Sequence, residues 1–190
     1  MREIVFDTET TGREPFIRGG DGRLIGDRIV EIGAIELMNL NPTGRTLHLY
    51  ICPQCEVPEE VVRIHGLTTH FLRDKPPFAS VVEQILEFFG DAPLIAHNAE
   101  FDRKFINAEL MELGLPLISD TRCIDTLPIA RKKFPGASNS LDALAKRFQL
   151  DRYGFDLAAR KGPGGHGALV DAKILAEVYL ELKGGREQRL

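Results

Sequence analysis

The stretch Ile4-Val5-Phe6-Asp7-Thr8-Glu9-Thr10-Thr11-Gly12 begins as a strand and ends as a loop. Residues 4–6 are β-branched or aromatic, the types that are enriched in strands. Successive side chains of a strand point to opposite sides, so Asp7 and Glu9 share one side of the sheet. Two such carboxylates repel each other unless a divalent cation lies between them. The stretch therefore predicts either a metal site at the carboxyl end of a strand or a solvated strand end.

Two more strand-like runs follow, at residues 29–37 and 47–52, and each is bounded by turn signals. Three successive strands predict an antiparallel meander. Residues 12–27 separate the first two strands. They are rich in Gly and Arg and contain the turn pairs Gly19-Gly20 and Asp21-Gly22, so we expect a loop there.

From residue 80 the pattern alternates between helix and strand. Apolar residues recur with helical period, with Ser80 as the expected cap and Gly90 as the stop: Val81, Val82, Ile85, Leu86 and Phe89. A strand at 94–96, a helix at 99–113, a strand at 121–126 and helices from Ser140 and Ala168 follow. A meander followed by this alternation predicts an α/β fold with a mixed sheet covered by helices on both faces.

Composition narrows the class of protein. The 190 residues are 43% hydrophobic and 27% charged, which suits one globular domain, and the net charge of −4 excludes a basic nucleic-acid coat. A signal peptide and a long apolar run are both missing from the sequence, so we expect a cytoplasmic protein without a membrane partner. The three cysteines, Cys52, Cys55 and Cys123, are expected to be reduced.

Two further motifs carry acidic residues. His97-Asn98-Ala99-Glu100-Phe101-Asp102 follows the strand at 94–96, with Asn98 as a possible helix cap and Asp102 about one turn into the helix. His166 stands among glycines before the last helix, which carries Asp171. Taken alone, Asp102 is an ordinary acidic residue near a helix N-terminus, and His166 is an exposed loop histidine.

Read together, the three motifs supply four carboxylates and one histidine, a complete set for two-metal phosphodiester hydrolysis. Their order and spacing resemble the exonuclease family named for its Asp-Glu-Asp-Asp set, in the subgroup with a catalytic histidine (DEDDh). Within it, the proofreading members that serve bacterial replicative DNA polymerases are most similar. The segments Glu31-Ile32-Gly33-Ala34, Phe134-Pro135-Gly136 and 140–144 extend the resemblance from residue 3 to about residue 185.

The resemblance implies a ribonuclease-H-like three-layer fold, in which helices flank a mixed five-stranded sheet, and one exonuclease domain over residues 1–190. It implies two divalent cations, Mg²⁺ or Mn²⁺, with His166 as general base. The implied metal ligands are Asp7, Glu9, Asp102 and Asp171. Within residues 58–66, Glu60 and His65 are expected to touch the terminal nucleotide, and Glu59 competes with Glu60 for that role.

The implied activity is 3'-5' removal of nucleoside 5'-monophosphates from single-stranded or mismatched DNA 3' ends, in partnership with a polymerase catalytic subunit. An RNA-trimming exonuclease of the same fold is the first alternative. A catalytically inert nucleic-acid-binding or assembly domain is the second. Family members commonly continue into a tail that binds the polymerase and the sliding clamp, and we expect this chain to be a catalytic domain without it.

Three other features have open roles. Arg131-Lys132-Lys133 and Arg160-Lys161 are either phosphate contacts or solvated faces. The loop at 151–165 is longer than the usual connection in the family, so its path is open. Cys52-Pro53-Gln54-Cys55, with His48 nearby, could bind metal or act in redox chemistry, but the lack of a second pair favours ordinary thiols.

Overall fold

The computed structural model describes residues 1–20, 22, 24–158 and 165–185. Its centre is a five-stranded sheet in the order β5-β4-β1-β6-β7. Strands β1 (Arg2–Thr10), β4 (Ile29–Met38) and β5 (Asn41–Tyr50) pair antiparallel, which confirms the predicted meander. Strands β6 (Leu94–Ala96) and β7 (Cys123–Asp125) continue the sheet in parallel to β1, so the sheet is mixed.

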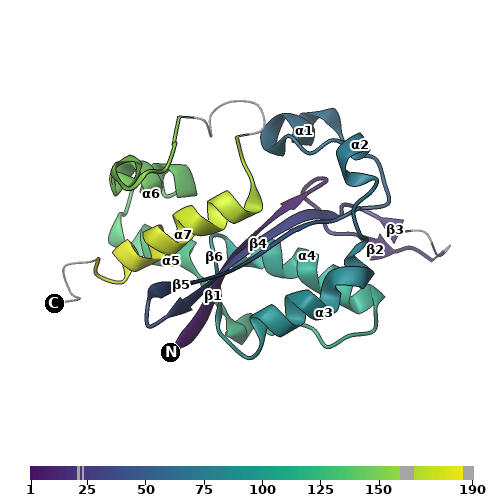
Figure 1. Ribbon diagram of the computed structural model, residues 1–190, viewed down its shortest axis with the longest axis horizontal. Helices are drawn as coiled ribbons and strands as arrows, with labels where there is room; N and C mark the ends of the chain where they lie inside the picture. Colours follow the sequence, from purple (N-terminus) through teal and green to yellow (C-terminus); the bar gives the residue numbers. More distant parts are fainter. Residues whose placement is uncertain (21, 23, 159–164, 186–190) are drawn as a thin grey trace.

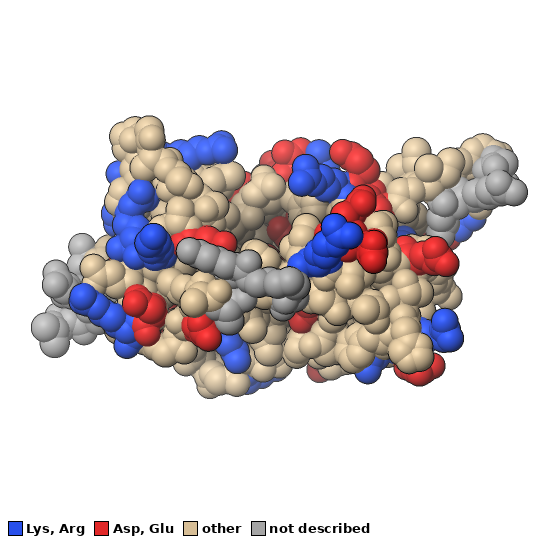
Figure 2. Space-filling model, turned by 90° about the horizontal axis from the view of Figure 1, so that it is seen from above, with Lys and Arg blue, Asp and Glu red and all other residues tan. Residues whose placement is uncertain are grey.

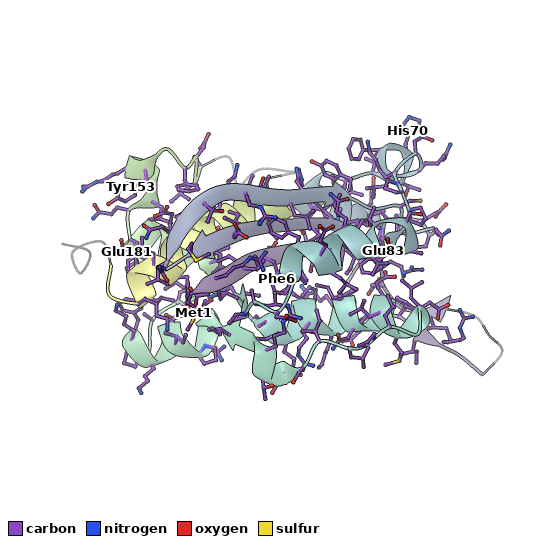
Figure 3. All side chains as sticks on the ribbon, turned by 60° about the horizontal axis from the view of Figure 1, so that its bottom comes forward. Met1, Phe6, His70, Glu83, Tyr153 and Glu181 are labelled. Atoms are coloured by element: carbon purple, nitrogen blue, oxygen red, sulfur yellow. The ribbon has the colours of Figure 1, made fainter. Side chains whose placement is uncertain are left out.

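Helices cover both faces of the sheet, as predicted (Figure 1). One face packs against α3 (Phe78–Phe89) and α4 (Ala99–Glu112) through buried residues such as Ile4 and Phe6. Figure 3 shows Phe6 on the side of the sheet that faces these helices. The other face, which includes Val5, packs against α7 (Ala168–Leu182). Helices α5 (Thr126–Lys133) and α6 (Leu141–Arg147) pack beside α7. Burial of these apolar faces is the main favourable contribution to the fold.

Helix α7 approaches β4 closely because Gly33 has no side chain. A Cβ atom at Gly33 would lie 2.2 Å from the backbone nitrogen of Leu169. Such a contact is sterically forbidden, so only glycine permits this packing. The contact brings the beginning of α7, and with it His166 and Asp171, to the carboxyl end of β1.

Two short helices, α1 (Glu59–His65) and α2 (Thr69–Leu72), lie beyond that same end of β1 (Figure 1). The 3₁₀ turns Asp120–Arg122 and Leu150–Tyr153 precede β7 and follow α6. None of the helices in the described ranges combines the length and the apolarity that are needed to cross a lipid bilayer.

The expected loop at 12–27 is in part a hairpin, which corrects the prediction. Strands β2 (Ile17–Arg18) and β3 (Leu24–Ile25) pair antiparallel. Each has only two residues, too few to produce a periodic pattern. The loop joins the body through Arg28, which makes two hydrogen bonds of 2.8 Å to the buried carboxylate of Glu109 on α4.

Other boundaries also differ from the predictions. Strand β5 begins at Asn41 instead of residue 47, because an edge strand with one exposed side does not need apolar residues. Ser80 does not cap α3, which already begins at Phe78. Helices α1, α2 and α5 were not predicted, since each is short and has a weak apolar pattern. Gly90 at the end of α3 and Ser140 as the cap of α6 are confirmed.

Candidate active site

The first acidic pair lies on β1 as the strand period predicts. Asp7 and Glu9 are half-buried, whereas Thr8 and Thr10 between and beyond them are buried on the other side. In the antiparallel pairing with β4, Asp7 lies opposite Gly33 and Glu9 lies opposite Glu31. The two carboxylates therefore face the side of the sheet that α7 covers.

Helix α7 and the residues before it bring two more groups to Glu9. Ligand atoms of Glu9, His166 and Asp171 all lie within 4.8 Å of one another. The His166 Nδ1 and an Asp171 carboxylate oxygen are 3.2 Å apart. The backbone N–H of His166 donates to the carbonyl of Ile64 on α1 at 3.3 Å. Helix α1 thus holds the backbone that presents the imidazole.

Asp102 contacts β1 from α4, at the residue between Asp7 and Glu9. The group of Glu9, His166 and Asp171 in the described residues includes neither Asp102 nor Asp7. The Asp102 carboxylate accepts hydrogen bonds from the backbone N–H of Thr8 at 3.0 Å and from the Thr8 hydroxyl at 2.7 Å. Burial raises the pKa of Asp102 from an ordinary 3.8 to about 7, and the negative charge of Asp125 adds to this effect, while the Thr8 hydrogen bonds oppose it. A nearby cation would favour the charged form of this carboxylate.

Asp125 is a site residue that the sequence reasoning missed. Its side chain accepts hydrogen bonds of 2.9 Å from the backbone N–H groups of Asn98 and Leu127, so it caps α5 and fixes the turn before α4. Asn98 occupies the N-cap position of α4 as predicted, but its backbone is left-handed (φ 67°) and its side chain makes no capping hydrogen bond. The predicted strand at 121–126 ran through this position, whereas β7 ends at Asp125 and α5 begins at Thr126. The signal for Asp125 was its place directly before Thr126-Leu127-Pro128, a common helix start.

Glu9, His166 and Asp171 are called the acidic cluster below. A cavity of about 380 Å³ opens beside Glu9 of this cluster. It is lined by residues of β1, the following loop, α1 and α4, including Thr8, Glu9, Thr10, Gly12, His65 and Phe101. Only 5% of His65 is exposed; its Nδ1 accepts from Leu67 N–H at 3.0 Å, and its buried Nε2 has no hydrogen-bond partner in the described chain. Burial lowers the pKa of His65, so its ring is neutral near pH 7.

The two glutamates considered for nucleotide contact are both exposed on α1. Glu59 forms an ion pair of 3.3 Å with Arg63 one turn later, so it is engaged on the outer face of the helix. Glu60 is exposed and its role stays a prediction. Seen from above, acidic side chains gather around α1, and Lys and Arg gather over α6 (Figure 2).

The basic clusters differ in their surroundings. Arg131 lines a groove of about 880 Å³ together with Asn98 and Ser140, and Asn98 also lines the 380 Å³ cavity. Lys133 instead donates to the Glu181 carbonyl at 2.9 Å and so completes the end of α7. Arg160-Lys161 and the middle of the long loop, residues 159–164, lie outside the described residues.

The donor atoms suit a divalent metal ion. Hard cations prefer carboxylate oxygens, and a buried carboxylate with a raised pKa lacks the positive charge that would stabilise its ionised form. Within the described residues, Glu9, His166 and Asp171 are the one group of three potential ligands gathered in this way. Cys52 and Cys55 are free thiols. Cys55 is exposed, yet partial desolvation of its thiol raises its pKa, which is the opposite of an activated redox cysteine. His48 bonds to Glu31 instead, at 2.6 Å.

The chain is similar to known proteins over almost its whole length. The exonuclease family model matches residues 4–179. DNA polymerase III subunit epsilon of Rickettsia conorii is 49% identical over 190 residues, with 98% of this chain and 76% of the relative covered. The same subunit of Escherichia coli strain K12 is 42% identical over 189 residues, with 97% of this chain and 72% of the relative covered.

A solved structure shows the same fold. Escherichia coli Exonuclease I, in complex with a dT13 oligonucleotide, superposes with a TM-score of 0.73 at 18% identity, over 99% of this chain and 42% of that one. The ribonuclease-H-like architecture predicted from the motifs is therefore confirmed. The chain belongs to the exonuclease family, whose members use divalent metal ions, and within it to the group of the DNA polymerase III epsilon subunits.

Proposed function

We propose that this chain is a 3'-5' exonuclease that removes nucleoside 5'-monophosphates from unpaired DNA 3' ends and proofreads for a replicative polymerase. The observation that carries the proposal is the meeting of Glu9, His166 and Asp171 within 4.8 Å, beside a cavity large enough for a nucleotide. The described residues and the small remainder of the chain would act as one catalytic domain.

Four carboxylates would hold the metal ions: Asp7, Glu9, Asp102 and Asp171. Bound divalent cations would supply Lewis acidity and would neutralise the negative charge of the phosphodiester. Two hydrogen bonds from Thr8 orient Asp102. Glu9 and Asp171 come from separate elements, β1 and α7. Mg²⁺ and Mn²⁺ both suit such oxygen ligands.

His166 would accept a proton from the attacking water. Its Nδ1 faces Asp171 at 3.2 Å, and a proton on Nδ1 leaves Nε2 with the lone pair that a base requires. The glycines at 165 and 167 leave the backbone on both sides of the ring free of side chains. A positioned base of this kind accelerates reactions by about 10²- to 10⁴-fold.

The terminal nucleotide would occupy the 380 Å³ cavity, where the buried Nε2 of His65 can bond to it. Glu60, with Glu59 as the alternative, would contact the same nucleotide from α1. Preceding phosphates would run past Arg131 in the neighbouring groove. A base pair must open before its 3' nucleotide enters such a cavity, and a mismatch lowers the cost of opening.

One experiment tests this function against its alternatives. The protein is incubated with Mg²⁺ or Mn²⁺ and with 5'-labelled DNA or RNA of equal sequence, as single strands, matched duplexes and duplexes with a terminal mismatch. We expect single-nucleotide ladders, faster on unpaired and mismatched DNA than on matched DNA. Preference for RNA would indicate the RNA-trimming alternative. Absence of products with every substrate, or full activity of Asp7→Ala, would overturn the proposal.

A further inference from the structure

Glu31 and His48, which are not among the predicted site residues, lie on β4, which pairs with the strand of Glu9 in the acidic cluster, and on β5, which pairs with β4. Glu31 on β4 is opposite Glu9 in the strand register, and only 3% of it is exposed. Its carboxylate is 2.6 Å from the Nε2 of His48 on β5. The His48 ring is itself held at 4.7 Å from the ring of Tyr50. A buried carboxylate with a well-oriented partner has a fixed position.

That carboxylate lies against the chain that leads from His166 into α7. A Cβ atom at Gly167 would be 3.8 Å from each oxygen of Glu31. Gly167 is the N-cap residue of α7, and because it is a glycine it has no side chain that could cap the helix. The first N–H groups of a helix have no acceptor within the helix and carry partial positive charge. Glu31 therefore places a negative charge at the beginning of α7.

From this geometry we propose that Glu31, oriented by His48, is a positioning residue for catalysis. It fixes the first turn of α7 on β4, so that His166 and Asp171 face Glu9. Gly33, two residues further along β4, permits the close contact on which this depends. The inference rests on the proposed nuclease function, but the position of His166 can be measured without any reaction.

A purely structural role makes a different prediction, and the chain offers a matched control. Glu36 is also a buried carboxylate of β4, and it is held by Arg2 at 2.6 Å and by Arg45 at 2.9 Å. Glu36 lies opposite Ile4, near the amino end of β1, whereas Glu31 lies opposite Glu9, near its carboxyl end. Loss of either carboxylate is expected to lower the melting temperature, whereas only loss of Glu31 should alter the site.

The first readout is steady-state kinetics on a single-stranded DNA oligomer with Mg²⁺, for Glu31→Ala, Glu31→Gln and Glu36→Ala. We expect Glu31→Ala to lower kcat by about 10- to 100-fold, the usual effect of removing a group that orients catalytic ligands. KM should stay within about twofold, because the nucleotide cavity is untouched. Glu31→Gln should recover part of kcat, since an amide oxygen still accepts a hydrogen bond from His48. Glu36→Ala should keep the wild-type kcat.

The second readout is the ring nitrogen NMR signal of His166 in the metal-free protein, assigned by its loss in His166→Ala. We expect this signal to shift in Glu31→Ala and to stay in place in Glu36→Ala. This readout stays informative if the wild-type protein proves to have no nuclease activity, so the two proposals can fail separately.

A third measurement tests whether the pair acts as a unit. His48→Ala should lower kcat as Glu31→Ala does, and the double variant should be no slower than the slower single variant. His48→Ala and Glu31→Gln also keep the test possible if Glu31→Ala does not fold. The inference is overturned if the folded variants at Glu31 and His48 show the wild-type kcat and an unmoved His166 signal.

Discussion

The two faces of the sheet contribute to the site in different ways. On the α4 face, Asp102 is buried and receives two hydrogen bonds from Thr8, and Asp125 fixes the turn that precedes the helix. On the α7 face, Glu9 and His166 are half-exposed, and His166 follows a glycine-rich segment. Asp171 on the α7 face is buried as well. From the difference in exposure we infer a rigid half around Asp102 and an adjustable half around Glu9 and His166.

The largest effect is expected from Asp102→Asn, which removes the charge of the rigid half. Activity should fall by about 10⁴-fold or more, because one of the four proposed ligands to the metal is lost. The melting temperature of the metal-free protein should not fall, since the ionised carboxylate is unfavourable in this buried position. Single-turnover rates and thermal melts measure both effects.

Glu109→Gln is the matched control, because Glu109 is buried on the same helix and is paired with Arg28 at 2.8 Å. It should lose stability and keep activity, the reverse of Asp102→Asn. If Asp102→Asn also destabilised the metal-free protein, the α4 half would be a structural element and not a preformed ligand.

The next effect concerns the adjustable half. His166→Ala should lose about 10²- to 10⁴-fold in single-turnover rate and keep its affinity for a nucleoside monophosphate, because the carboxylates remain. His70→Ala is the control, since His70 is exposed at the outer end of the molecule on α2 (Figure 3) and neither lines the cavity nor belongs to the ligand group. If His166→Ala kept the wild-type rate, His166 would not be the base, and other groups would have to activate the water.

A smaller effect should follow from Thr8→Val, which removes the hydroxyl bond to Asp102 and keeps the backbone bond. We expect a rate loss of about 10-fold or less and a stability loss of about 1–3 kcal/mol, because the valine leaves a buried acceptor with one donor fewer. Thr43→Val removes a comparable 2.8 Å bond to Glu36 far from the site, and it should leave the rate unchanged. Equal rate losses in Thr8→Val and Thr43→Val would show that the Thr8 bond has no special role in the site, and the proposed rigid half would lose its support.

The smallest predicted effect is a pH dependence of stability, which arises from His97 beside the rigid half. His97, at the end of β6, bonds through both ring nitrogens, to the Thr126 hydroxyl and to the Asn139 carbonyl, each at 2.8 Å. Burial lowers the pKa of His97 below its ordinary 6.5, with Arg131 acting in the same direction and Asn139 and Asp125 opposing it.

Because the folded state favours the neutral ring, its contribution to stability is present above about pH 6.5 and is lost as the pH falls through the lowered pKa. The melting temperature should therefore drop more between pH 7.5 and pH 5.5 in the wild type than in His97→Gln, which cannot titrate. Parallel curves for the two proteins would contradict this assignment.

The sequence predicted the elements that have a long apolar period or a strong stop signal. Strand β4 and helices α4 and α7 were found because their burial repeats over several turns or pleats. The hairpin β2-β3 and the polar half of β5 were missed, since neither has a buried face long enough to leave a pattern.

The site shows the same division. The acidic motifs could be recognised because their residues are close in sequence or match a family pattern. Glu31 and His48 could not, because their pairing comes from strand register. Asp125 had a local signal as a helix cap, but its bond to Asn98 depends on a tertiary contact. Register pairs residues from separate strands, and no local spacing encodes it.

The acidic cluster joins the first strand of the chain to its last helix, which has a consequence during protein synthesis. Glu9 leaves the ribosome early and Asp171 leaves it late. A growing chain that still lacks α7 has neither the complete set of proposed ligands nor the proposed imidazole base, so under this proposal it cannot cut the nucleic acids around it. The contact between β1 and α7 also spans most of the sequence, and such contacts tend to form slowly. Nuclease activity should thus appear only after translation has passed residue 171 and the chain has closed on itself.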